Sequence, residues 1–131
     1  MLTFEPLTAR IIGAAFRVHN TLGPGYLEHI YRDALALELS GEGLHVRVEA
    51  PITVHYNGVA LGTCAADLIV ERTVVAELKA QEAILPGHMA QLRAYLRSSG
   101  HPAGIVINFG PVKVEMKRAE ARGMPGREKA G

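Results

Sequence analysis

The chain has 131 residues, of which 48% are hydrophobic and 21% are charged, and its formal net charge is +1. This length and composition predict one globular domain and exclude a chain that is disordered throughout. A net charge so close to zero provides no strong field to attract nucleic acid, so any contact with phosphates must come from a local patch. The single cysteine, Cys64, excludes an internal disulfide and a cysteine-rich zinc site, and we interpret it as a small buried residue.

Targeting signals are absent from the pattern. The N-terminus lacks the basic start and the long apolar run that are typical of a signal peptide. No apolar stretch is long enough to span a bilayer. We therefore expect a cytoplasmic protein that makes no contact with membranes.

A first helix is expected to begin at Thr8, which can cap it, with Leu7 packed on Ile12. The sequence Gly23-Pro24-Gly25 should end this helix. Its predicted buried stripe follows helical spacing and comprises Ile12, Ala15, Phe16, His19 and Leu22. Because His19 lies on that stripe, we interpret it as packed and hydrogen-bonded rather than as a ligand.

A second helix is expected from about Tyr26 to Leu39. Its predicted apolar face comprises Leu27, Ile30, Tyr31, Ala34 and either Leu37 or Glu38. Glu28 falls in the first turn, where the helix dipole favours a negative charge, and this effect alone could explain the residue. Tyr31 is three residues further on and is a neighbour of Glu28 on the helix surface. We interpret Tyr31 as a core aromatic whose hydroxyl braces its surroundings.

Three strands follow. An extended stretch from Val46 to Tyr56 is joined by the hairpin signal Asn57-Gly58 to a return strand from Val59 to Val70, and Val74 to Ala80 forms the third. Residues two apart on a strand face the same side, so Glu77 and Lys79 share a face.

The loop between the second and third strands decides which residues meet. A three-residue loop at Glu71, Arg72 and Thr73 sets Asp67 opposite Glu77, whereas a two-residue loop turns Asp67 to the other face. A cluster of these acids therefore requires an odd loop or a bulge.

Two carboxylates and an amine on one patch of sheet are typical of metal-assisted phosphodiester cleavage. Hard oxygen ligands suit Mg²⁺ or Mn²⁺, and a lysine can stabilise developing charge or orient the attacking water. Crowding of such acids should raise the pKa of at least one of them unless Lys79 offsets the repulsion. The spacing alone also fits two solvated residues, Glu77 and Lys79, on an exposed sheet face.

The last third of the chain predicts a helix with Pro86 near its first turn and a core stripe of Met89, Leu92 and Leu96. An adjacent stripe contains His88, Gln91 and Tyr95, which by itself could be a polar flank. The apolar run 105–109 predicts a buried strand, and the alternating residues 112–117 predict a possible short edge strand. Residues 119–131 show no periodicity, and we expect a disordered tail there.

The segment 25–31 has the form G-x-x-E-x-x-Y. Together with Asp67, Glu77-x-Lys79 and Gln91-x-x-x-Tyr95, it resembles the GxxExxY protein family, from about Leu7 to Lys117 or Arg118. That family is similar to the PD-(D/E)XK nuclease superfamily on its Cas4/RecB-like side. The resemblance implies an α/β fold with a restriction-endonuclease-like core in the order ααβββαβ, in which helices flank a mixed sheet within residues 1–118.

The resemblance also implies a metal-dependent nuclease that acts on nucleic acid, with DNA as the favoured substrate. Asp67 and Glu77 would bind Mg²⁺ or Mn²⁺ with the backbone carbonyl of Leu78, and Glu28 would complete the acidic cluster. Lys79 would be catalytic. The substrate-binding residues implied on the helical side are Gln91, Tyr95 and Tyr31. Family members often carry Arg where this chain has Ala65, and this departure removes one possible phosphate contact.

Two alternatives remain open from the sequence. One is a non-catalytic nucleic-acid-binding module, and the other is an interaction subunit whose pocket serves a partner. A chain this small has little surface for a long substrate, so a homodimer or a protein partner is also plausible.

Overall fold

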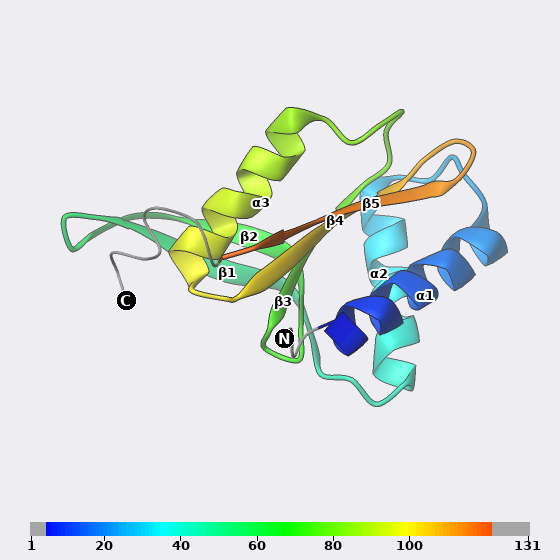
Figure 1. Ribbon diagram of the computed structural model, residues 1–131, viewed down its shortest axis with the longest axis horizontal. Helices are drawn as coiled ribbons and strands as arrows, with labels where there is room; N and C mark the ends of the chain where they lie inside the picture. The colour runs from blue at the N-terminus through cyan, green and yellow to red at the C-terminus, as the bar shows by residue number, and fades with distance from the viewer. Residues whose placement is uncertain (1–4, 122–131) are drawn as a thin grey trace.

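A computed structural model describes residues 5–121 of the chain. A five-stranded mixed sheet is covered by two helices on one face and by one helix on the other (Figure 1). The elements in chain order are α1 Glu5–Leu22, α2 Glu28–Gly41, β1 Val46–Tyr56, β2 Val59–Val70, β3 Val74–Lys79, α3 Pro86–Ser99, β4 Ala103–Phe109 and β5 Val114–Glu120. The predicted α/β class and element order are confirmed, and β5 lies where the possible short edge strand was predicted, although it runs further, to Glu120.

The strands lie side by side in the order β1-β2-β3-β4-β5. Neighbouring strands are antiparallel except β3 and β4, which are parallel. A parallel pair needs a crossover connection, and α3 provides it. The sheet therefore presents the C-terminal end of β3 and the N-terminal end of α3 at the same edge.

The two helix layers pack on separate cores. The side chains of α1 and α2 contact alternate residues of the inner strands, such as Leu68, Leu78 and Ile105. The side chains of α3 contact the residues between them, such as Ile69, Val75 and Val106. Because β3 and β4 are covered on both faces, nearly every residue in them is buried, as expected for a parallel pair.

The buried face of α1 differs from the prediction. The helix begins at Glu5, so Thr8 is a buried residue inside it and not its cap. Phe16 is 45% exposed, and the buried residues are Thr8, Ile11, Ala14, Ala15, Val18 and His19. His19 is packed and hydrogen-bonded as predicted, since its Nε2 lies 2.9 Å from the carbonyl oxygen of Gly110.

The predicted apolar face of α2 is also wrong in part. Leu27 and Leu37 are 72% and 75% exposed, and the buried residues are Tyr31, Leu35, Ala36 and Leu39. The helix carries apolar residues on more than one row, so helical spacing could not identify the row that meets the sheet.

The C-terminal boundary of the domain lies further along the chain than predicted. Strand β5 runs to Glu120, and Ala121 is buried against the layer under α3. Ala119 and Glu120 thus belong to the sheet and not to a tail. The remainder of the predicted tail, 122–131, lies outside the described residues.

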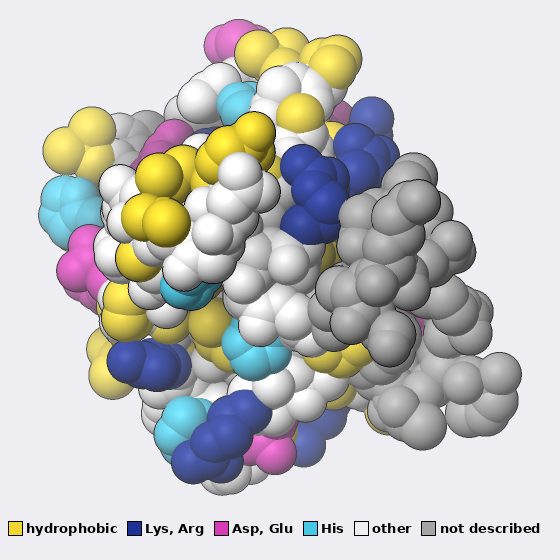
Figure 2. Space-filling view, turned by 90° about the vertical axis from the view of Figure 1, so that its left-hand side faces the viewer, with side chains coloured by type: hydrophobic (Ala, Val, Ile, Leu, Met, Phe, Trp, Pro, Cys, Tyr) yellow, Lys and Arg dark blue, Asp and Glu magenta, His cyan; other side chains and the backbone are white. Residues whose placement is uncertain are grey.

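The β1–β2 hairpin projects from the sheet (Figure 1). Its turn is Asn57-Gly58, as predicted, with φ angles of 51° and 76°. Tyr56, Val59 and Leu61 near the tip are each at least 60% exposed, and Figure 2 shows hydrophobic side chains on this end of the molecule.

Helix α3 packs directly on β4 at Gly104, which has no side chain. A Cβ atom at Gly104 would lie 2.6 Å from Leu92 Cδ1 and 3.1 Å from the Val75 carbonyl oxygen. This close approach fixes the height of α3 above the sheet. None of the helices in residues 5–121 is long and apolar enough to cross a membrane.

Candidate functional site

The candidate site lies where β2 and β3 separate. The two strands pair from Val70↔Val74 to Leu68↔Ala76, around a three-residue loop, which sets Asp67 opposite Glu77 as predicted. Beyond this point β2 pairs only with β1, while β3 continues beside β4. A gap therefore opens in the middle of the sheet.

Two carboxylates bridge this gap. The Asp67 N–H donates to Glu77 Oε2 at 2.9 Å, and the Leu78 N–H donates to Asp67 Oδ2 at 2.8 Å. Side-chain oxygens thus take the place of the carbonyl partners that a continuing ladder would supply. Glu77 is only 4% exposed. The two acids are consequently held close together, with Glu77 buried and Asp67 half-buried.

Burial and mutual repulsion disfavour the ionised acids. Burial, and then the neighbouring Asp67 charge, raise the pKa of Glu77 to about 7. Burial also raises the pKa of Asp67, against the opposing effects of the Leu78 N–H and Lys79. The predicted upward shift is confirmed, but burial, not repulsion, is its larger cause.

Lys79 faces the same region. Its Nζ lies 3.4 Å from Gln91 Oε1 on α3, near the outer limit for a hydrogen bond. Its charge lowers the pKa of both Asp67 and Glu77. The structure therefore brings Asp67, Glu77 and Lys79 together, as the strand register predicted.

Helix α3 adds a polar flank to the site. Met89, Leu92 and Leu96 face the sheet, as predicted. Tyr95 has a raised pKa because of burial, the Glu77 charge and a hydrogen bond with Cys64. Cys64 is thus a half-buried hydrogen-bonding partner, not the simple core residue we predicted.

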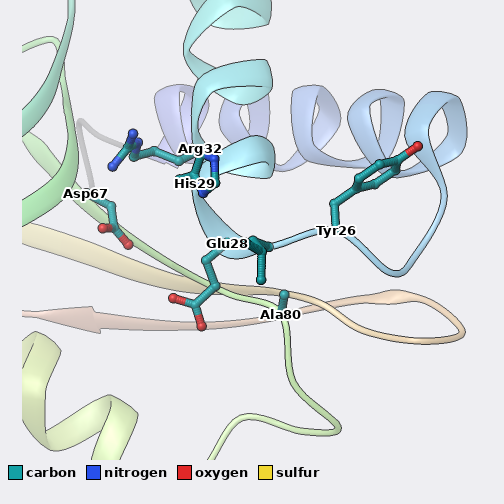
Figure 3. Close-up of a pocket in the computed structure, with 7 residues that line it drawn as sticks. Tyr26, Glu28, His29, Arg32, Asp67 and Ala80 are labelled. Carbon is teal, nitrogen blue, oxygen red and sulfur yellow. The ribbon is translucent and has the colours of Figure 1, made fainter.

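Glu28 approaches from α2. Its charge raises the pKa of both Asp67 and Glu77. It lines a cavity of about 440 Å³ with Tyr26, Leu27, His29, Arg32, Asp67 and Ala80. In Figure 3 the carboxylates of Glu28 and Asp67 lie below α2, while the Tyr26 ring points away from them.

Arg32 is a site residue that the sequence interpretation missed. It lines the same cavity, and its charge lowers the pKa of Asp67. Its guanidinium forms ion pairs with Asp33 and Glu49, both at 2.9 Å. The available signal was spacing, because Arg32 follows Glu28 by four residues and so lies on the same helix face.

Asn108 was missed as well. It is fully buried, and its amide bonds both the N–H and the carbonyl of Gln81 at 2.9 Å. A lone amide inside the apolar run of β4 must form hydrogen bonds when it is buried. This pattern in the sequence could have identified Asn108. The pair fixes the chain as it leaves β3 toward α3.

Tyr31 does not reach the surface of the site. It is fully buried and stacks on Phe109 with ring centroids 4.5 Å apart. Its hydroxyl donates to the Gly23 carbonyl at 2.6 Å and accepts from the Tyr26 N–H at 3.3 Å. The implied substrate-binding role is therefore wrong, since a fully buried ring cannot touch a substrate. Tyr31 instead braces the segment that leads into Glu28, as its interpretation as a core aromatic predicted.

The acid pair offers oxygen ligands to a metal ion. Within residues 5–121, no group of three or more His, Cys, Asp and Glu side chains is placed to hold one. Asp67 Oδ1 and Glu77 Oε1 remain outside the two backbone hydrogen bonds. Two carboxylates beside a backbone carbonyl suit Mg²⁺, which uses few protein ligands and keeps several waters. A cation would also favour the ionised forms that burial opposes, so Asp67, Glu77 and Leu78 fit a hard divalent ion.

Comparison with known proteins places this geometry in a family. The family model of the PD-(D/E)XK nuclease superfamily matches residues 5–119. The chain belongs to this superfamily. Its nucleases cleave phosphodiester bonds in nucleic acid and generally use divalent metal ions.

Two further comparisons bear on the fold and on relatives. The crystal structure of SSO0001 is similar to this chain with a TM-score of 0.57 and 19% identity, over 97% of this chain and 65% of that one. At this identity the likeness shows a shared fold. The chain spans less than two thirds of the length of that protein. A search of curated protein sequences finds no match.

Proposed function

We propose that the chain is a metal-dependent nuclease that hydrolyses phosphodiester bonds in DNA. The observation that carries the proposal is the pair of carboxylates at the β2–β3 gap, with Lys79 two residues beyond Glu77 on the same strand. We further propose the finer assignment to the GxxExxY family on the Cas4/RecB-like side. It rests on Gly25, Glu28 and Tyr31 together with Gln91 and Tyr95.

The roles of the acids follow from their positions. Asp67 and Glu77, with the carbonyl of Leu78, would hold Mg²⁺ or Mn²⁺. The ion would polarise a phosphoryl oxygen and lower the pKa of a bound water. Asp67 and Glu77 keep their places because backbone N–H groups fix one oxygen of each. Glu28 adds negative charge from the α2 side and favours cation binding.

The remaining residues act on the substrate. The Lys79 ammonium would stabilise the negative charge that develops on the phosphate oxygens. Gln91 Oε1 accepts from Lys79 Nζ at 3.4 Å and so orients the lysine. The Gln91 amide would also contact the substrate strand. Tyr95 would contact the same strand from the next turn of α3.

The test combines cleavage with thermal melting. Wild-type protein should cut single- or double-stranded DNA in Mg²⁺ or Mn²⁺. It should also be stabilised by about 2.7 kcal/mol at a metal concentration one hundredfold above the dissociation constant. Asp67→Asn should lose both effects, because one metal ligand becomes neutral. Glu82→Gln, an exposed acid in the loop after β3, is the matched control and should keep both. Cleavage that survives Asp67→Asn would contradict the proposal.

A second candidate is a non-catalytic nucleic-acid-binding module on the same fold. It is favoured by the two backbone hydrogen bonds, which already occupy one oxygen of each acid without a metal. DNA binding without cleavage, together with melting that ignores millimolar Mn²⁺, would select this candidate over the nuclease.

A further inference from the structure

A second pocket lies beside the candidate site and is lined by basic side chains. Its volume is about 470 Å³, and its lining residues are His45, Arg47, Ile69, Arg72 and His101. These residues come from the start of β1, the end of β2, the β2–β3 loop and the segment after α3. Three segments far apart in the sequence thus contribute two arginines and two histidines, around one apolar residue.

The two arginines differ from most others in the described chain. Arg10, Arg17, Arg32 and Arg118 form ion pairs with carboxylates on neighbouring elements. Neither Arg47 nor Arg72 makes an ion pair within residues 5–121. Both are exposed, so their guanidinium groups are available to an external anion. The nearest acid in sequence, Glu71, instead accepts a hydrogen bond from the His45 N–H at 2.6 Å.

The backbone that carries Arg72 is strained. Glu71 and Arg72 have φ angles of 52° and 53°, in the left-handed region that glycine and asparagine favour. A turn of two such residues would normally be built from Asn-Gly, as it is at the β1–β2 hairpin. Arginine at this position carries a conformational cost. Persistent strain of this kind is found where a side chain serves a function.

The pocket lies a short distance from the acids. Arg47 pairs directly with Ile69 across β1 and β2, and Ile69 is two residues from Asp67 on β2. Two residues along a strand span about 7 Å. Phosphates follow one another by about 3.4 Å along the axis of each strand of a duplex. The basic pocket and the acid pair are therefore close enough for nearby phosphates of one strand to reach both.

We propose that the pocket of His45, Arg47, Arg72 and His101 binds one backbone phosphate of a nucleic acid strand, while a nearby phosphate of the same strand reaches Asp67 and Glu77. This inference rests on the proposed nuclease function and names how its substrate is held. A chain of net charge +1 needs a local basic patch to hold nucleic acid. The arginines of the pocket would also replace the phosphate contact that is lost because this chain has Ala65 where family members often carry Arg. The lower part of the face drawn in Figure 2 carries Lys or Arg and His side chains, with Asp or Glu among them.

The experiment measures binding separately from cleavage. A fluorescent DNA oligonucleotide is titrated by anisotropy in EDTA, at several salt concentrations from about 50 mM. The variant Arg47→Gln/Arg72→Gly should bind at least tenfold more weakly than wild type. The slope of the logarithm of its binding constant against the logarithm of the salt concentration should also be less steep. The expected change is about 0.7 to 0.9 for each phosphate that the variant no longer neutralises. Arg17→Gln, on α1 at the other face of the sheet, is the control for a missing positive charge and should bind within twofold of wild type.

A folding defect would not imitate this result. Glycine suits the left-handed backbone at residue 72, so Arg72→Gly alone should melt at or above the wild-type temperature while it binds DNA more weakly.

Two outcomes would overturn the inference. One is equal binding by the double variant and by Arg17→Gln. The other is a mononucleotide that competes as strongly as an unlabelled oligonucleotide when both are compared at equal phosphate concentration. That result would assign the pocket to small phosphorylated ligands. If binding depends on the pocket but no DNA is cut in Mg²⁺ or Mn²⁺, the nuclease proposal fails and the phosphate site stands.

Discussion

The acid pair and the basic pocket lie two residues apart on β2, at Asp67 and Ile69, yet their charged groups differ in burial and in pairing. Glu77 is 4% exposed, and its pKa is raised to about 7 by burial and by Asp67. Arg47 and Arg72 are exposed and pair with no carboxylate of the described chain. In the proposed function, the acids bind a cation that enters the protein, whereas the arginines bind an anion at its surface.

Under the proposed function, this difference would let a nearly neutral chain bind a polyanionic substrate. Buried acids hold their geometry through backbone hydrogen bonds, since desolvation makes an unpartnered carboxylate costly. Exposed arginines need no such partners, because water solvates them until a ligand arrives. Changes at the acid pair should therefore affect stability and chemistry, whereas changes in the pocket should affect affinity and its salt dependence.

Glu77→Gln should have the largest effect on stability. The pKa of Glu77 is raised from 4.5 in its ordinary state to about 7 in the fold. The folded protein therefore holds a proton that the unfolded chain releases above pH 4.5. The stabilisation is complete below pH 4.5 and is lost as the pH rises through 7, by about 3 kcal/mol in total. The variant should lose this dependence and exceed wild type in stability at pH 8 without metal.

Chemical denaturation from pH 4 to pH 8 in EDTA measures this effect. Glu82→Gln is the control and should retain the wild-type profile. Equal pH profiles for wild type and Glu77→Gln would show that Glu77 is not the buried acid described above.

Lys79→Met should come next, with a loss of about one hundredfold in cleavage rate, or about 2.7 kcal/mol in the barrier. Stabilisation by Mn²⁺ should persist, because Asp67 and Glu77 remain. Single-turnover cleavage and melting with and without Mn²⁺ give the two readouts. Lys113→Met, an exposed lysine between β4 and β5, should cut at the wild-type rate. A Lys79→Met protein that cuts normally would remove Lys79 from the chemistry.

Arg72→Gly should stabilise the fold by about 1 kcal/mol, since it relieves the left-handed backbone. Arg72→Ala is the matched variant, because it removes the same charge but keeps the strain. Thermal melting should therefore separate glycine from alanine, while DNA binding should weaken equally in both. If the alanine variant melts at the same temperature as the glycine variant, residue 72 is not strained in solution.

Tyr95→Phe should have the smallest effect, a loss of about 0.5 to 1.5 kcal/mol in unfolding free energy. The change removes the hydroxyl that bonds Cys64 and leaves the ring in place. Cys64→Ala gives the matched test from the other partner, because alanine cannot form a hydrogen bond through its side chain. Calorimetry of each variant and of the pair should show effects that do not add, because both remove one interaction. Additive losses would mean that the hydrogen bond contributes nothing.

The strand register could be predicted because it depends on short-range geometry. Side chains on a strand alternate with a period of two, so a three-residue loop after Val70 was enough to set Asp67 opposite Glu77. The flank of α3 that carries Gln91 and Tyr95 followed from helical spacing in the same way. The turn at Asn57-Gly58 required only that two adjacent residues tolerate positive φ.

The faces of α1 and α2 could not be predicted so well. Both helices carry several apolar rows, and Phe16 and Leu37 fit the spacing yet lie exposed. Which row is buried depends on where α1 contacts α2 and where both contact the sheet. Those contacts are made by residues distant in sequence, which periodicity does not include.

The sequence by itself determined the order of the elements, the register at the β2–β3 loop and the types of side chain that meet there. Only the tertiary structure decided how deeply those side chains are buried, and so why the pKa of Glu77 is raised. It also placed Arg32 beside Asp67 and gathered Arg47, Arg72 and two histidines into one pocket. The physical reason is one of range. Alternation and turn geometry act between neighbours along the chain, whereas desolvation and charge interactions depend on every element that packs around a group.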